Sequence, residues 1–391
     1  MNVARAIINQ KGAGRLKAGH PWVFASDIVA VKGDYEPGDV LEIADERGRF
    51  LGQGYFNPRS QIALRFLTPE QEKIGPAFWR RRLEAAWEYR RRLVNTSSCR
   101  LVFAEADFIP ALIVDKFGDY LVIQSLALGI ARWQDTLVDL LVELLAPRGI
   151  YARNDVKVRE IEGLPLEKGC LYGKFDPLIQ IEEHGLKFWV DVENGQKTGY
   201  FLDQRENRAA LAPFVSGARV LDCFCHTGAF ALHAAFYGAR EVVGIDISPE
   251  AVAMAEKNAR LNGLEHLCRF KVGNVFDELR ALARDRERYD VVILDPPAFT
   301  KSRQAVEGAA RGYKEINLRA LKLIPPGGFL VTASCSQHMS PELFRAIVAE
   351  AASDTNRRLR LVEYRTQAKD HPVLVAAPET EYLKFFIFQV F

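Results

Sequence analysis

The sequence predicts an α/β protein in which an open, doubly wound sheet of seven strands follows a small β-rich domain and a central α+β domain. From Arg219 onward, apolar strand segments alternate regularly with amphipathic helix segments. Before Leu67 the segments are short and β-like, and between these two regions the pattern is mixed. The 391 residues also exceed the roughly 150 residues of one domain. We therefore expect domains at 1–70, 71–175 and 176–391.

The composition is typical of a globular protein with a large core, at 48% hydrophobic and 26% charged residues. Lysine and arginine number 52 against 50 acidic residues, so the net charge of +2 does not by itself indicate a nucleic-acid partner. None of the six cysteines forms a C-x-x-C pair, which predicts reduced thiols and no metal site. No stretch reaches the roughly 18 apolar residues of a membrane helix, so we expect no membrane partner and a cytoplasmic location.

Basic residues mark the first segment of the β-rich domain. Strand-like segments separated by turn residues fall at 39–45, 49–56 and 61–67. The first 26 residues contain no acidic residue and are interrupted by glycines, which predicts a loop able to follow a phosphate backbone closely. The candidate RNA-binding residues of this loop are Arg5, Lys11, Arg15 and Lys17. A merely solvated loop is the alternative interpretation.

A long helix and a strand pair predict the central domain. The helix is expected over 76–95, and because its six arginines cannot share one face, we expect most of them to be solvated. Strands at 111–115 and 120–125 flank a turn, and a helix over 130–145 is expected to pack on them.

The last domain begins with a hairpin at 178–182 and 186–191 and continues with alternating strands and helices. Its expected strands are 219–223, 241–246, 269–272, 289–294, 329–334, 359–364 and 382–390. Its expected helices are 229–237, 249–261, 276–284, 313–323 and 341–353. Such an order implies a parallel sheet with helices on both faces.

Acidic residues lie at the first two strand ends of this sheet, where open α/β folds bind their ligands. Asp222 lies in a strand that leads through a turn to a helix at Gly228, and Asp246 ends the next strand. A carboxylate at the second position can accept both hydroxyl protons of a ribose. The turn lacks G-x-G-x-x-G, which disfavours NAD and FAD and favours a nucleoside cofactor without phosphates. An ordinary strand–helix turn is the alternative.

Two further strand ends carry groups suited to chemistry on a base. Asp295 is followed by two prolines, whose fixed backbone can hold its carboxylate against a planar ring. Cys335 follows another apolar strand, and a thiolate there can attack an electron-poor ring carbon. The alternatives are a tight turn without chemistry and a buried structural cysteine. We interpret Cys223 and Cys225 as packing residues.

Other polar residues are expected near the same edge. Asn274, after the third strand, could hydrogen-bond an adenine amino group. His226, His338 and Lys301 could each act as a base or contact a phosphate, although a solvated loop residue is the alternative for each.

Taken together, the motifs resemble one family over essentially the whole chain. GQKTGYFLDQREN, VLDCFCHTGAFALHAA, VVGIDIS, ILDPPAFTKS and VTASCS are similar to the class I S-adenosylmethionine-dependent 23S ribosomal RNA methyltransferases that modify carbon 5 of cytosine. The opening KGAGRLKAGHPWVFASDI resembles the PUA domain that these enzymes carry. The resemblance implies a Rossmann-like seven-stranded sheet, S-adenosylmethionine as cofactor and 23S ribosomal RNA as partner. The resemblance is compatible with a homodimer.

The resemblance also implies residue roles. The turn after Asp222 would cradle the methionine part of the cofactor, Asp246 would bind its ribose, and Asn274 would meet its adenine, where the family commonly has Asp. The cofactor-binding residues implied are Asp222, Phe224, His226, Thr227, Gly228, Asp246, Ile247, Asn274, Asp295, Thr198, Gln204 and Arg205. The RNA-binding residues expected are Arg5, Lys11, Arg15, Lys17 and Lys301.

The implied catalytic residues are Cys335 and Asp295. The Cys335 thiolate would add to C6 of cytosine, C5 would receive the methyl group, and the C5 proton and the thiol would then leave. Asp295 would hydrogen-bond N3 and the amino edge. Many such enzymes carry a further cysteine after the proline pair, where this chain has Ala298. The rival interpretations are a ribosomal RNA guanine-N2 methyltransferase, which needs no nucleophilic cysteine, and a non-catalytic RNA-binding assembly factor.

Overall fold

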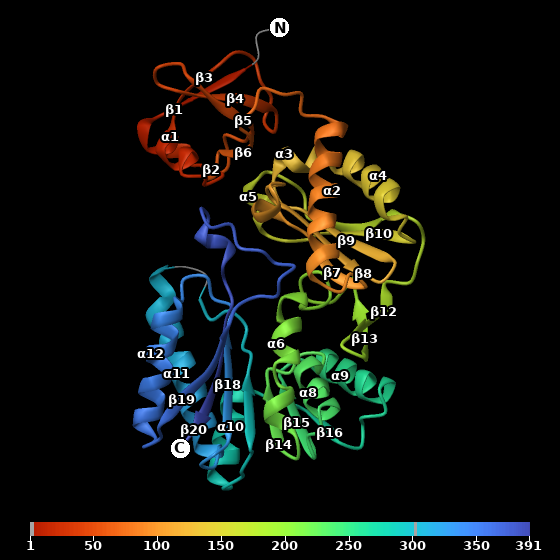
Figure 1. Ribbon diagram of the computed structural model, residues 1–391, viewed down its shortest axis with the longest axis vertical. Helices are drawn as coiled ribbons and strands as arrows, with labels where there is room; N and C mark the ends of the chain where they lie inside the picture. The colour runs from red at the N-terminus through yellow and green to blue at the C-terminus, as the bar shows by residue number, and fades with distance from the viewer. Residues whose placement is uncertain (1–3, 301–302) are drawn as a thin grey trace. The chain divides into compact units, whose positions relative to one another are not determined.

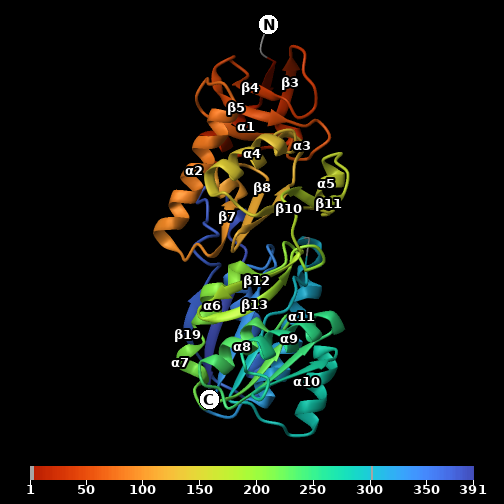
Figure 2. The same ribbon diagram turned by 90° about the vertical axis from the view of Figure 1, so that its right-hand side faces the viewer.

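The computed structural model describes residues 4–300 and 303–391, and the chain in it forms two compact units. The first unit contains residues 1–181 together with 190–202 and 369–380. The second contains residues 182–189, 203–368 and 381–391. The helices and strands of each unit can be followed in Figure 1 and, from the side, in Figure 2. The three domain ranges that the sequence suggests stay a prediction.

The first unit opens with a six-stranded sheet of order β2-β6-β5-β4-β1-β3. Its strands are β1 (Arg5–Ile8), β2 (Trp22–Val23), β3 (Ile28–Lys32), β4 (Val40–Asp45), β5 (Phe50–Phe56) and β6 (Leu64–Thr68). A small core of aliphatic side chains with Phe56 fills one face. The β-rich character predicted for the start of the chain is confirmed.

The basic segment expected to be a loop contains a helix, α1 (Gln10–Lys17), so that expectation is wrong. Asn9 caps this helix, because its side chain accepts a hydrogen bond from the Gly12 backbone N at 2.8 Å. Gly12 itself packs closely on Asp27, since an added Cβ would lie 2.9 Å from the Asp27 Cβ. Gly12 therefore serves close packing of the helix rather than a loose loop, whereas a Cβ added to Gly14 would meet nothing within 4 Å.

A five-stranded sheet of order β11-β10-β9-β8-β7 forms the rest of the first unit. Its strands are β7 (Ser98–Phe103), β8 (Leu112–Phe117), β9 (Tyr120–Ser125), β10 (Gly149–Asn154) and β11 (Glu167–Tyr172). Its helices are α2 (Pro76–Leu93), α3 (Leu128–Ala131), α4 (Gln134–Leu145) and α5 (Val158–Ile161). Apolar side chains of α2 and α4 pack with those of the sheet into one core, as the central α+β pattern predicts.

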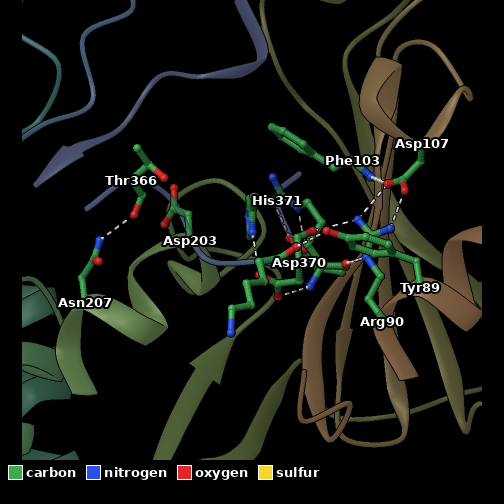
Figure 3. A network of polar contacts seen from close by, with 12 residues as sticks. Tyr89, Arg90, Phe103, Asp107, Asp203, Asn207, Thr366, Asp370 and His371 are labelled. Carbon is green, nitrogen blue, oxygen red and sulfur yellow. Dashed lines mark hydrogen bonds and ion pairs between the residues drawn. The ribbon is translucent and has the colours of Figure 1, made fainter. Parts of the chain in front are cut away.

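One arginine of α2 is buried rather than solvated, and it binds a segment that is distant in the sequence. Arg90 is fully buried, and its guanidinium donates to Oδ2 of Asp107 and to the backbone O of Asp370, both at 2.7 Å. The Asp370 carboxylate accepts in turn from the Arg100 backbone N at 2.9 Å. Figure 3 shows Arg90, Asp107 and Asp370 of this network. This network holds residues 369–380 in the first unit, although the chain reaches them after most of the second.

The second unit contains, within the described residues, a seven-stranded sheet of order β16-β15-β14-β17-β18-β20-β19. Its strands are β14 (Arg219–Cys223), β15 (Glu241–Asp246), β16 (Cys268–Val272), β17 (Val291–Leu294), β18 (Phe329–Ser334), β19 (Leu359–Arg365) and β20 (Lys384–Val390). The pairs from β16 to β18 are parallel, whereas β20 is antiparallel to both of its neighbours. The predicted fold class is confirmed.

Helices cover both faces of this sheet. They are α6 (Arg205–Ala209), α7 (Ala212–Val215), α8 (Ala229–Phe236), α9 (Pro249–Leu261), α10 (Val275–Arg284), α11 (Val306–Leu323) and α12 (Pro341–Asp354). The strand order runs outward from β14 to β16 and then returns through β17 to β18. Because crossovers between parallel strands are right-handed, α8 and α9 lie on one face and α10 and α11 on the other.

A buried ion pair lies within the second unit, at the tip of the hairpin formed by β12 (Leu178–Glu183) and β13 (Leu186–Asp191). The Arg208 guanidinium donates to both carboxylate oxygens of Glu183, at 2.6 and 2.8 Å, and both side chains are buried. His233 of α8 is fully buried beside them and stacks on Phe188, with ring centroids 5.8 Å apart. Burial lowers the pKa of His233 to about 4.

Acid should therefore weaken this unit through His233. The unfolded ring has a pKa near 6.5, so below that pH the unfolded chain binds a proton that the folded chain does not. We expect the free energy of unfolding to fall by about 2 kcal/mol between pH 7 and pH 5 through this residue alone. Urea unfolding of the wild type and of His233→Gln measures this, since the variant should lose that part of the pH dependence. His266→Gln, at an exposed histidine, is the matched control. Equal pH dependence in the wild type and His233→Gln would contradict the expectation.

Candidate active site

The parallel strands of the second unit bring four candidate residues to one edge of the sheet. In the strand register Cys223 pairs with Ile245 of β15 and with Leu294 of β17, and Leu294 pairs with Thr332 of β18. The carboxyl ends of these strands therefore meet at the same edge. The residues at or directly after these ends are Asp222, Asp246, Asp295 and Cys335.

Asp222 is a fully buried carboxylate. Its Oδ2 accepts a hydrogen bond from the Ala231 backbone N at 2.9 Å, while Oδ1 has no hydrogen-bond partner within residues 4–300 and 303–391. Burial raises the pKa of Asp222 well above its ordinary value, and the charges of Asp295 and Asp246 add to this effect. The negative charges of Asp295 and Asp246 thus act on Asp222, which favours a ligand that brings positive charge and hydrogen-bond donors.

The turn between β14 and α8 adopts a strained backbone that forms a cradle. Phe224 and His226 both have positive φ, at 63° and 50°, and Gly228 has φ of 83°. A Cβ added to Gly228 would lie 3.0 Å from the Ala255 Cβ, so the turn packs tightly on α9. The Thr227 backbone O accepts from Asn258 Nδ2 at 3.1 Å, which fixes the turn further.

Asp246 supports the same turn and stays available to a ligand. Its Oδ2 accepts from the His226 backbone N at 2.9 Å, and its Oδ1 accepts from the Ser248 backbone N at 3.0 Å. Each carboxylate oxygen has a second lone pair, so Asp246 can still accept ribose hydroxyl protons. The next residue, Ile247, is 68% exposed and offers an apolar surface beside it.

Asn274 has a structural role that the sequence interpretation missed. It caps α10, because its Oδ1 accepts from the Phe276 backbone N at 2.9 Å. The oxygen expected to meet an adenine amino group is therefore engaged at the helix end. The signal was present in the sequence, since Asn followed three residues later by Asp is typical of a helix start.

The residues of the GQKTGYFLDQREN stretch fall in different surroundings. Thr198 is buried in the first unit, where its hydroxyl donates to Asp115 Oδ2 at 2.5 Å. Gln204 belongs to the second unit, and its Nε2 donates to Asp295 Oδ1 at 2.9 Å. Arg205 is buried at the start of α6. Gln204 therefore contacts the carboxylate expected to meet the base, which the sequence interpretation did not foresee.

Cys335 lies beside the Asp-Pro-Pro turn, as the neighbouring strands predict. Its Sγ is 4.0 Å from the backbone O of Pro296, and the residue is half-buried. Cys223 and Cys225 are buried, and burial raises the pKa of both thiols well above the ordinary value, so neither is a ready nucleophile. Cys335 is thus the thiol at this edge that a substrate could reach.

The expected RNA-binding residues divide into paired and exposed groups. Arg5 forms an ion pair with Glu42 at 2.6 Å, and Arg15 forms one with Asp27. Lys11 and Lys17 are exposed. Lys301 lies outside the described residues.

Two further features of the described residues bear on other classes of function. In the part of the chain that the structure describes, no group of three or more His, Cys, Asp or Glu side chains could hold a metal ion. None of the helices in residues 4–300 and 303–391 is both long and apolar enough to cross a membrane.

Two family models match this chain. A PUA-like domain matches residues 6–69, and an S-adenosylmethionine-dependent methyltransferase matches residues 166–386. The cradle, the unsatisfied Asp222 oxygen and Asp246 fit that cofactor, whose sulfonium and amino groups are positive and whose ribose donates hydrogen bonds.

Close relatives carry the name ribosomal RNA large subunit methyltransferase I. The protein of Citrobacter koseri is 42% identical over 377 residues, which cover 95% of this chain and 95% of the relative. The protein of Tolumonas auensis is 43% identical and covers 93% of this chain and 94% of its own length.

Solved structures share the fold. A protein of Streptococcus mutans assigned as a SAM-dependent methyltransferase has a TM-score of 0.83 at 21% identity, covering 98% of this chain and 99% of that one. A methyltransferase solved with SAH has a TM-score of 0.85 at 20% identity and the same coverage. With the family match, this chain belongs to the S-adenosylmethionine-dependent methyltransferase family, joined to an amino-terminal PUA-like domain.

Proposed function

We propose that this protein methylates C5 of a cytosine in large-subunit (23S) ribosomal RNA through a covalent bond between Cys335 and C6. One observation carries the choice of C5: the Cys335 thiol lies 4.0 Å from the backbone O of Pro296, directly after Asp295, at the edge that bears the cofactor cradle. The names of the relatives support the RNA substrate. Direct transfer to an amine would need no thiol at this place.

The chain's own groups suit the binding of the cofactor. When bound, S-adenosylmethionine supplies an electrophilic methyl group on a positively charged sulfur. Asp222 and the turn 224–228 would hold its methionine part, and Asp246 with Ile247 would hold its nucleoside. That positive charge would offset the negative charges of Asp295 and Asp246, which act on the buried Asp222.

Cys335 and Asp295 have different roles in the reaction of the base. The Cys335 thiolate adds to C6, which makes C5 nucleophilic, and C5 then receives the methyl group. Asp295 in its protonated form donates to N3, where negative charge develops, and accepts from the amino group. Loss of the C5 proton and expulsion of the thiolate then restore the aromatic ring. Because Ala298 stands where many RNA cytosine-C5 methyltransferases have a second cysteine, a water or another base must take that proton.

Gln204 orients Asp295 for this contact. Its amide donates to Asp295 Oδ1, and its own Oε1 accepts from Asn207 Nδ2 at 2.7 Å. Asn207 Oδ1 accepts from Arg365 Nε at 3.1 Å, so a chain of side chains fixes the amide. We infer that Gln204 is a positioning residue rather than a cofactor ligand.

The substrate base must leave its helix to reach this edge, so the target cytosine is unpaired or flipped out. The PUA-like domain would grip neighbouring RNA by its backbone and shape, with Arg5, Lys11, Arg15, Lys17 and Lys301 as the candidate contacts. We expect the protein to act in the cytoplasm, either as a monomer or as a homodimer.

The function is tested on ribosomal RNA from a strain that lacks this protein. Wild-type protein should convert a cytosine of 23S RNA to 5-methylcytosine. The methylation rate of Cys335→Ala should be at least roughly a thousandfold lower, because the nucleophile is gone. Mass-spectrometric mapping reads the product, and calorimetry should show unchanged binding of S-adenosylmethionine. Cys170→Ala, at an exposed thiol of the first unit, is the control and should stay active. Methylation retained by Cys335→Ala would point to transfer to an exocyclic amine, and intact cofactor binding without any methylation by the wild type would point to an assembly factor.

The role of Gln204 is tested with Gln204→Met, which keeps the length of the side chain and removes its amide. Loss of a hydrogen bond to a charged group should lower kcat by about tenfold to a hundredfold with little change in the Kd of S-adenosylmethionine. Gln389→Met is the matched control, because Gln389 pairs with Phe329 at the opposite end of β18. A weakened cofactor Kd with unchanged kcat would instead make Gln204 a cofactor ligand.

A further inference from the structure

A buried lysine lies next to the proposed nucleophile. Lys384 is the first residue of β20 and pairs with Ser334, the last residue of β18, in the antiparallel register. The residue is only 3% exposed, and its Nζ donates to the backbone O of Ser336 and of Tyr382, both at 2.7 Å. Lys384 is thus tied to the residue on each side of Cys335, by the pairing of its backbone with Ser334 and by the hydrogen bond of its amine to Ser336.

The surroundings of Lys384 leave its charge poorly compensated. Burial lowers the pKa of Lys384 to about 8, and Cys335 and Glu381 are the groups whose charges oppose that effect. From α11, Tyr313 also faces the turn, and its hydroxyl contacts Oγ of Ser334 and of Ser336 at 2.9 Å. Burial raises the pKa of Tyr313, so this phenol stays neutral. Backbone carbonyls alone do not neutralise a buried ammonium, whereas a thiolate does.

We propose that the Lys384 ammonium holds the Cys335 thiolate in an ammonium–thiolate pair, which makes it a positioning residue for the nucleophile. The S–H bond breaks and its proton passes to solvent, while Lys384 keeps its own proton and its positive charge offsets the negative charge on the sulfur. The inference rests on the proposed cytosine-C5 function, in which Cys335 must attack as a thiolate. A purely structural lysine would only fasten the start of β20 to the turn, and it would leave the acidity of Cys335 unchanged.

The acidity of Cys335 is measured on the full-length protein without RNA or cofactor. Iodoacetamide alkylates thiolates, and the peptide that contains Cys335 is quantified by mass spectrometry across the pH range. For the wild type we expect an inflection at least about one pH unit below the roughly 8.5 of a free cysteine. Lys384→Met should raise the inflection by about one unit or more, which slows alkylation near pH 7 about tenfold.

Two further variants separate charge from structure. Lys384→Arg keeps a positive charge at this place and should keep the low inflection. Lys322→Met, the same change at an exposed lysine of α11, should behave as the wild type. If Lys384→Met does not fold, as judged by its thermal unfolding, the wild-type profile and Lys384→Arg decide the question.

An inflection of the wild type at or above 8.5, or the same inflection in Lys384→Met and the wild type, would overturn the proposal. The outcome is separate from that of the proposed function. A lowered inflection together with an active Cys335→Ala would leave the pair in place and refute the covalent mechanism. An inactive Cys335→Ala together with an unshifted inflection would leave the mechanism in place and refute the role of Lys384.

Discussion

The parallel alignment of β14, β15, β17 and β18 is the constraint on which the site depends. Because each of these strands is parallel to its neighbours in the set, all of their carboxyl ends lie at one edge of the sheet. Acidic residues lie at three of those ends, and the negative charges of Asp295 and Asp246 act on the third, Asp222, which is fully buried. A fold that keeps an unsatisfied carboxylate there is suited to a ligand that carries positive charge and hydrogen-bond donors. The cofactor cradle follows from the topology together with these acids.

Chemistry at the same edge depends on how two side chains are held. Gln204 fixes one oxygen of Asp295, and the backbone around Cys335 is tied to Lys384 on the neighbouring antiparallel strand. β20 supplies that lysine because it lies between β18 and β19, although it is last in the chain. The segment between β19 and β20 also leaves the second unit, since residues 369–380 are fastened in the first by the Arg90 network.

The sequence was sufficient for the features that repeat along the chain, such as the alternation of strands and helices and the polar residues at strand ends. It was not sufficient where distant segments meet. The insertion of β20 beside β18 joins segments about 50 residues apart, and no local pattern predicts that Lys384 will lie beside Cys335. Glycines near the start suggested a loop, yet the packing of Gly12 on Asp27 allows a helix there. The local sequence was sufficient to predict that Asn274 caps a helix, but we predicted an adenine contact for this side chain instead.

Trapping of the covalent bond tests the central claim most directly. In ribosomal RNA that contains 5-fluorocytidine, the fluorine at C5 cannot leave as a proton, so the bond between the protein and C6 should persist after methyl transfer. We predict an RNA–protein complex that survives denaturing electrophoresis, with the modified nucleotide attached to the peptide that contains Cys335. A bond at another cysteine, or no complex under conditions in which ordinary RNA is methylated, would contradict the account.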